Sequence, residues 1–69
     1  MKVIELVGSS PKSFSEAVRN AVQTASKTIR NITGVEVINS NATVEGGKLT
    51  NYKVACKIAF LIDASEVGS

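Results

Sequence analysis

The stretch from Tyr52 to Ile62 shows the most sustained alternation in the chain and predicts its central β-strand. Its even-numbered positions are all large or apolar, whereas its odd-numbered positions mix lysine with small residues and one leucine. A period of two is typical of a strand with two distinct faces. One face is suited to pack against a helix. The other face, with Lys53 and Lys57 between alanines, is neither polar nor a normal core, so we expect another copy of the chain to cover it.

An amphipathic helix is predicted to start at Ser13. The segment Ser13-Phe14-Ser15-Glu16 has the form of a capping box, in which the serine oxygen accepts from the Glu16 amide and the glutamate reaches back. Apolar residues then recur at the spacing of a single helical stripe, which predicts a helix of about 17 residues, or about 25 Å. The stripe contains Phe14, Ala17, Val18, Ala21, Val22, Ala25, Ile29 and Ile32. Asn31 and Gly34 can both adopt the left-handed conformation that closes a helix.

Two further strands flank this helix in the sequence. Residues 2–7 predict a first strand that Gly8-Ser9-Ser10-Pro11 ends, with Ile4 and Leu6 on one face. Residues 35–44 predict a second strand. In that strand one face would carry Val35 and Val37, and the opposite face would carry Ile38, Ala42 and Val44.

The connections between these elements predict the topology of the sheet. Gly46 and Gly47 supply the positive φ angles of a two-residue hairpin, so the second and third strands pair antiparallel. The helix returns the chain to its starting end, which makes the first and second strands parallel to each other. The expected fold is therefore an α+β unit, β-α-β-β, with a three-stranded antiparallel or mixed sheet in the order 1-3-2 wrapped on one helix. We expect one domain, residues 1–69, with residues 63–69 as a flexible tail.

Length and composition favour a protein that associates with itself. A chain of 69 residues is near the size at which folding alone leaves a marginal core, so we expect it to need a staple or a partner. Cys56 is the sole cysteine and histidine is absent, which excludes a disulfide within the chain and argues against structural zinc. The net charge of +2 is mild, and no window is long and apolar enough to span a membrane. We therefore expect a cytoplasmic protein without a membrane or nucleic-acid partner.

The sequence offers no catalytic or metal-binding constellation. Cys56 falls on the helix-facing side of the central strand, where packing is its expected role, and no histidine could activate it. The acidic residues are too dispersed for a calcium loop, although symmetry could gather copies of one carboxylate around an axis. Lys53 and Lys57 are expected to form salt bridges with Glu5 or Glu36 rather than a phosphate site.

Four segments taken together resemble the dodecin family. They cover nearly the whole chain in the family's order: Val3-Ile4-Glu5-Leu6-Val7-Gly8-Ser9-Ser10, Ser13-Phe14-Ser15-Glu16-Ala17, Val35-Glu36-Val37-Ile38 and Tyr52-Lys53-Val54-Ala55-Cys56-Lys57-Ile58-Ala59-Phe60. The resemblance implies a hollow homododecamer of three-stranded sheets, each wrapped around one helix. It also implies a small ligand at the subunit contacts, which in many members is a pair of stacked flavins.

The chain departs from the flavin-binding pattern at two positions. The family's flavin-stacking tryptophan corresponds to Gly34, and the glutamine that hydrogen-bonds the flavin's pyrimidine edge corresponds to Lys53. Glycine loses the stacking energy of an aromatic pair, and lysine lacks the acceptor of an amide. The resemblance therefore places a ligand site at Gly34, Val35 and Lys53, without the family's usual flavin geometry.

Three functions stay open on the sequence. The first is a non-enzymatic dodecin shell that stores a small molecule or ions at subunit contacts. The second is storage of riboflavin or FMN, for which Lys53 could favour a phosphorylated flavin. The third is a small basic module that binds nucleic acid, which the three aromatic residues, Phe14, Tyr52 and Phe60, support poorly.

Overall fold

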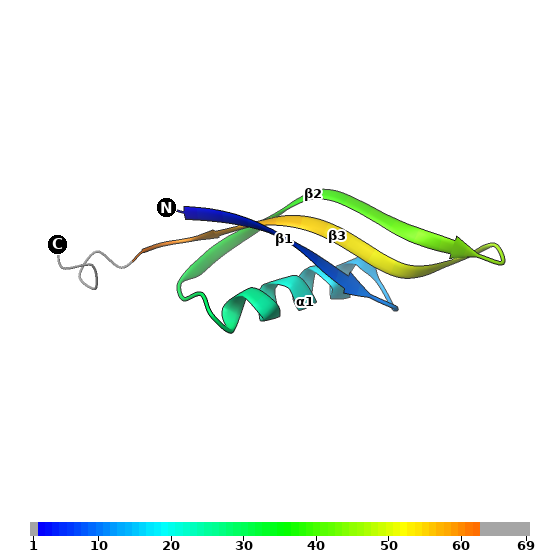
Figure 1. The fold of residues 1–69 in the computed structure, drawn as a ribbon, viewed down its shortest axis with the longest axis horizontal. Coiled ribbons are helices and arrows are strands. Elements are labelled where there is room, and N and C mark those ends of the chain that lie inside the picture. Colours follow the sequence, from blue (N-terminus) through cyan, green and yellow to red (C-terminus); the bar gives the residue numbers. More distant parts are fainter. Residues whose placement is uncertain (1, 63–69) are drawn as a thin grey trace.

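The computed structural model describes residues 2–62 and shows a three-stranded sheet with one helix on one face (Figure 1). The elements are β1 (Lys2–Ser10), α1 (Phe14–Ser26), β2 (Ile32–Glu45) and β3 (Lys48–Phe60). The strand order is β1-β3-β2, and both outer strands pair antiparallel with β3. The predicted β-α-β-β architecture and the 1-3-2 order are confirmed. The predicted tail, residues 63–69, lies outside the described residues.

The core lies between α1 and the central strand. Its buried side chains are small on the helix and larger on the strand: Ala17, Ala21, Ala25, Val54, Cys56 and Ile58. Alanines at a spacing of four give α1 a flat, narrow face, so the helix axis can lie close to the sheet. Cys56 is fully buried, as its place in the alternation predicted.

Gly8 extends β1 beyond the predicted end at Val7. Residues 8–10 remain in the strand because they pair with Val54, Lys53 and Tyr52 of β3. A Cβ atom on Gly8 would collide with the carbonyl oxygen of Ala17 and would lie 2.7 Å from the Ala21 Cβ. The glycine therefore marks the closest approach of helix and strand rather than a turn.

The start of α1 uses half of the predicted capping box. The Ser13 side chain accepts a hydrogen bond from the Glu16 amide at 3.0 Å, as expected. The Glu16 carboxylate, however, accepts from the Ser10 hydroxyl at 2.7 Å, and the same Ser10 oxygen accepts from the Lys12 amide. The buried Ser10 thereby ties the end of β1 to the first turn of the helix.

The helix is shorter than predicted and ends at Ser26. The Ser26 hydroxyl donates to the Val22 carbonyl, and the Lys27 and Thr28 amides bond three residues back, which tightens the last turn. Ile29 and Ile32 still pack against the core, so the apolar spacing continues after the helical backbone has stopped. Asn31 does adopt a positive φ, 61°, in the connection to β2, whereas Gly34 lies inside β2.

The β2–β3 hairpin differs from the prediction in its bounds and in its faces. Gly46 and Gly47 have φ angles of 58° and 76° and form the expected turn. β2 starts at Ile32 instead of residue 35, β3 starts at Lys48 and ends before Leu61, and β2 is one residue longer than β3. Bulges explain the error in the faces: the register shifts between Val37 and Asn39, so Ile38 lacks a β3 partner. Ala42 therefore shares the helix side with Val37, contrary to the prediction.

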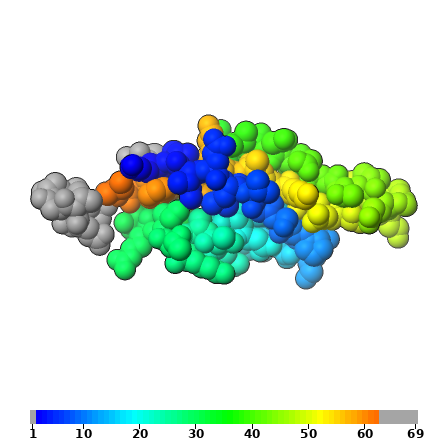
Figure 2. Space-filling view, viewed as in Figure 1, coloured from blue at the N-terminus to red at the C-terminus, as the bar shows by residue number. Residues whose placement is uncertain are grey.

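The hairpin runs well past the helix. Figures 1 and 2 show its tip projecting beyond the end of α1 where the helix begins. The Cα radius of gyration is 14.6 Å, compared with about 11 Å for a compact chain of this length. The helix packs mainly on β1 and β3 and has few contacts with β2. One chain therefore leaves much of its own sheet uncovered.

Candidate functional site

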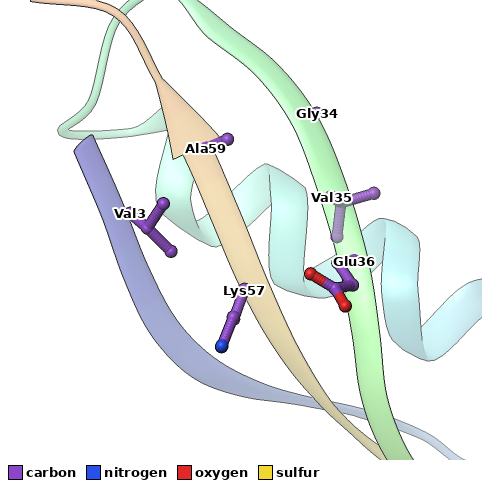
Figure 3. A pocket seen from close by; sticks show the side chains of 6 residues that line it. All are labelled: Val3, Gly34, Val35, Glu36, Lys57 and Ala59. Atoms are coloured by element: carbon purple, nitrogen blue, oxygen red, sulfur yellow. The ribbon is translucent and has the colours of Figure 1, made fainter. Parts of the chain in front are cut away.

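The candidate site is a hollow on the sheet face opposite α1. Residues of all three strands line a cavity of about 480 Å³ (Figure 3): Val3, Gly34, Val35, Glu36, Lys57 and Ala59. Val35 lies at its edge, because its β3 partner, Ile58, belongs to the helix side. In the close-up the helix lies behind the sheet. The hollow is thus separate from the helix-side core and open in a single chain.

Two neighbouring rows of paired residues build the hollow. In one row Ala59 lies between Val3 and Gly34, so small residues form its floor. In the next row Lys57 lies between Glu5 and Glu36. The rows are about 6.6 Å apart and three strands span about 10 Å, which matches the footprint of a small flat molecule.

Gly34 leaves space at the edge of the hollow. A Cβ atom built on it would have no neighbour within 4 Å, and its backbone angle is not left-handed. This glycine is therefore not required by the backbone, and its effect is to keep the surface open. An alanine here would therefore add its methyl group without a clash.

The charged row gives the hollow one cationic and one anionic group. Lys57 has a carboxylate neighbour on each side in the register, Glu5 and Glu36, and its salt bridge with either of them stays a prediction. Lys53 differs, because its partners are the polar residues Ser9 and Asn41. Of the two lysines, only Lys57 lies beside acidic residues.

The structure brings two of the three predicted ligand-binding residues together. Gly34 and Val35 both line the hollow. Lys53 does not, since it lies six residues from Ala59 along β3, or about 20 Å. A single chain therefore cannot place Lys53 beside Gly34, and its role in the same site depends on another copy.

Four lining residues were not among the predicted ligand contacts: Val3, Glu36, Lys57 and Ala59. The alternation had already placed Lys57 and Ala59 on the face opposite the helix. What the sequence alone did not supply was the register that puts Val3 and Gly34 on either side of Ala59. The alternation of β3 thus indicated which residues share the open face. Their neighbours on the adjacent strands could not be assigned without the positions of the β-bulges.

Three other expectations for residues 2–62 concern the Cys56 thiol, a metal site and a membrane span. Burial raises the pKa of the Cys56 thiol, which keeps it neutral and unreactive at ordinary pH. Residues 2–62 contain no group of three or more side chains that could hold a metal ion. No helix within these residues is long and apolar enough to cross a membrane.

Known proteins with this fold share both sequence and architecture with the chain. Dodecin from Streptomyces coelicolor is 37% identical, with a TM-score of 0.83 over 90% of this chain and 89% of that one. Dodecin from Streptomyces davaonensis is 31% identical, with a TM-score of 0.82 over 90% and 91% of the two chains.

A third relative is the calcium dodecin of Mycobacterium tuberculosis. It is 30% identical over 59 residues, which cover 86% of this chain and 83% of the relative. Its crystal structure, described as that of a calcium-chelating antigen with a novel calcium-binding site, gives a TM-score of 0.76 over 93% of this chain and 91% of that one. The dodecin family model itself matches residues 1–63. The chain therefore belongs to the dodecin family.

Proposed function

We propose that this protein is a non-enzymatic, cytoplasmic dodecin that assembles into a hollow homododecamer and binds a small ligand where copies meet. The observation that carries the proposal is the three-stranded hollow on the uncovered sheet face. Ligand sites are normally enclosed and mostly apolar with a few polar groups. The hollow has that lining but lacks a cover in one chain, and another copy would supply it.

The family-equivalent residues fit a site shared between copies. Gly34 and Val35 form one edge of the hollow, while Lys53 lies on the same sheet face farther along β3. In this proposal the ligand rests on Gly34 and Val35 of one copy, and Lys53 of a neighbouring copy provides a cationic contact. The ammonium group would favour a ligand that carries an acceptor or a negative charge.

Riboflavin and FMN are the first ligands to test, although the hollow lacks the groups for ordinary flavin stacking. An aromatic pair contributes about 0.5–1.5 kcal/mol beyond the area that it buries. Gly34 cannot provide this contribution, and it offers little apolar contact area. We therefore expect riboflavin to bind weakly and FMN somewhat more tightly, because Lys53 can contact its phosphate.

Calcium is a second candidate ligand because one relative is described as a calcium dodecin. Residues 2–62 of a single chain hold no cluster of three potential metal-ligating side chains. A calcium site here would therefore need carboxylates from several copies, such as Glu5 or Glu36 gathered around a symmetry axis. Oxygen ligands of this kind suit calcium.

Native mass spectrometry tests the proposal directly. We expect a species of twelve chains, with any retained organic ligand or metal visible as added mass, and a metal adduct that disappears after treatment with EGTA. Protein that remains monomeric at micromolar concentration would overturn the proposal. A homododecamer that neither carries nor takes up any ligand would refute the binding function but leave the assembly intact.

Gly34→Trp tests whether the hollow is the ligand site. The Cβ atom of the new residue would meet no atom within 4 Å, so we expect the fold to be kept. We also expect riboflavin, followed by the quenching of its fluorescence, to bind at least tenfold more tightly. Gly46→Trp is unsuitable as a control because Gly46 has a positive φ, so Val44→Trp, at an exposed position outside the hollow, serves instead. Equal gains from both variants would show that the new indole, and not the hollow, captures the flavin.

A further inference from the structure

The charges around the hollow are not balanced. Of the residues that line it, Glu36 and Lys57 are charged, and the others are small or apolar. Glu5 lies outside the lining, but it is the β1 partner of Lys57, just as Glu36 is its β2 partner. The charged row therefore contains two carboxylates and one ammonium group. One negative charge is in excess beside the hollow, although the chain as a whole has a net charge of +2.

The two charged side chains of the hollow point in different directions. Figure 3 shows the Lys57 ammonium group on the β1 side of β3, which is the side on which the register places Glu5. The Glu36 carboxylate lies between β2 and β3. A lysine directed toward Glu5 leaves Glu36 as the charged group that is available to a molecule in the hollow.

The apolar part of the hollow lies one row away from these charges. Its floor is Ala59, between Val3 and Gly34, and the two rows are about 6.6 Å apart. A flat ring on this floor would therefore reach Glu36 through a short side chain. An ionised carboxylate is a hydrogen-bond acceptor only, so it takes an N–H or O–H donor and favours a cation. The lining thus suits a ring with a short cationic arm.

We propose that the hollow selects a flat, ring-containing amine whose ammonium group binds the Glu36 carboxylate, while Glu5 neutralises Lys57. This inference rests on the ligand site proposed above and names the chemical class of its ligand. Lys53 of a second copy would then receive an acceptor at the opposite end of the same molecule. Glu5 does not touch the ligand in this arrangement. It is a positioning residue, because it holds Lys57 away from Glu36.

A pair of probes that differ only in charge tests this selection. Tryptamine and indole-3-propionate share the indole ring and a two-carbon chain, which ends in an ammonium group in one and in a carboxylate in the other. The chain contains no tryptophan, so the anisotropy of indole fluorescence reports the probe alone. In titrations of the full chain at neutral pH and low salt, with EGTA present to remove calcium, we expect tryptamine to bind about tenfold more tightly than indole-3-propionate.

Glu36→Gln removes the proposed acceptor charge and keeps the shape of the side chain. We expect tryptamine to bind about tenfold more weakly to this variant and to lose its advantage over indole-3-propionate. Glu45→Gln is the matched control, since it removes the same charge from β2 at a position that pairs with Lys48 outside the lining of the hollow. It should leave the affinity for tryptamine almost unchanged. Circular dichroism and native mass spectrometry check that each variant folds and assembles like the native protein.

Glu5→Gln tests the role of the third charge. Without its β1 partner, Lys57 is expected to turn toward Glu36 and to compete with the amine. Tryptamine should then bind several-fold more weakly and indole-3-propionate more tightly, so the ratio of the two affinities falls. A purely structural role of Glu5 would weaken both probes alike and leave their ratio unchanged.

The outcomes separate this inference from the proposed function. A preference for tryptamine that Glu36→Gln abolishes and Glu45→Gln keeps supports the inference. Equal binding of the two probes, or a preference that survives Glu36→Gln, overturns it but leaves ligand binding at the hollow standing. Failure of both probes to bind overturns the amine class, and native mass spectrometry then shows whether the proposed function fails as well: a different retained ligand preserves that function, and no uptake of any ligand refutes it.

Discussion

Two regions of this small chain differ in how well their apolar side chains are covered. One is the part of the sheet under α1, and the other is the end of the β2–β3 hairpin that projects past the helix, called the β2–β3 arm below. Under the helix, the side chains of Val54, Cys56 and Ile58 have almost no solvent exposure. Along the arm, residues of equal hydrophobicity such as Val44 and Leu49 are more than half exposed. The amino-acid types are similar in the two regions, and what differs is whether this chain supplies a cover. The contrast shows that one chain covers part of its apolar surface itself and leaves a second part exposed, which the proposed assembly would cover.

Truncation of one aliphatic residue in each region should expose this contrast most strongly. Ile58→Ala leaves a cavity under the helix and is expected to lower the free energy of unfolding by about 2–5 kcal/mol, enough to unfold a domain of this size. Leu49→Ala should cost less than about 0.5 kcal/mol in the separated chain. Urea unfolding followed by circular dichroism measures both values.

Concentration provides the control for this comparison. If Leu49 is buried only by another copy, its effect grows as the chain is concentrated, because assembly adds to apparent stability. The cost of Ile58→Ala should be present at every concentration. Equal and concentration-independent costs would mean that the arm is covered within its own chain, contrary to the structure.

Two glycines offer the next largest difference. Gly8→Ala places a methyl group against the Ala17 carbonyl and the Ala21 side chain, which we expect to destabilise the protein by about 2–3 kcal/mol. Gly34→Ala meets no atom within 4 Å and should be neutral or stabilising by up to about 1 kcal/mol. Thermal unfolding of the two variants side by side is the measurement. A tolerated Gly8→Ala would show that the helix does not lie as close to β1 as described.

The neighbouring residues Ser9 and Ser10 allow a similar comparison of an exposed and a buried position, with a smaller expected change in stability. Ser10 is buried and joins the end of β1 to Glu16 and the Lys12 amide, so Ser10→Ala should cost about 1–3 kcal/mol through unpaired polar groups. Ser9→Ala changes an exposed side chain whose backbone carbonyl still accepts from Asn20, and we expect almost no effect. Urea midpoints distinguish the two. If the Ser9 variant is the less stable one, the assigned hydrogen bonds are wrong.

The sequence predicted the elements under the helix in detail, whereas for the exposed β2–β3 hairpin it predicted the turn and the pairing but not the faces of β2. Alternation in β3, the Ser13 cap and the Gly46-Gly47 turn are local signals, and they predicted the topology and the 1-3-2 order. The faces of β2 were mispredicted because the bulge at Ile38 depends on pairing with β3 and leaves no local mark. The true ends of β1 and α1 were likewise set by tertiary contacts of Gly8 and by the bonds that close the last helical turn.

The candidate site divides in the same way. Gly34 and Val35 were expected at a ligand site, and both border the hollow. Val3 and Ala59 line the hollow because the register places them beside Gly34. That register could not be predicted from the sequence, because β2 contains a shift in its pairing with β3. Whether Lys53 joins the same site is a question about another copy, since six residues of β3 separate it from Ala59.

The smallest expected effect is a pH dependence confined to the covered half. Burial raises the pKa of Cys56 above its ordinary value of 9.0, so the folded chain keeps its proton at a pH where the unfolded chain has lost it. The unfolded state then binds fewer protons, and stability must fall as the pH rises above about 9. The stabilising contribution is complete below that pH. Urea midpoints between pH 7 and 10 should decline slightly more for the native protein than for Cys56→Val, which keeps the packing but has no ionisable thiol. Identical pH profiles would mean that the Cys56 thiol is accessible to water. The core under the helix would then be less well buried than the structure shows, and its contrast with the exposed β2 would be weaker.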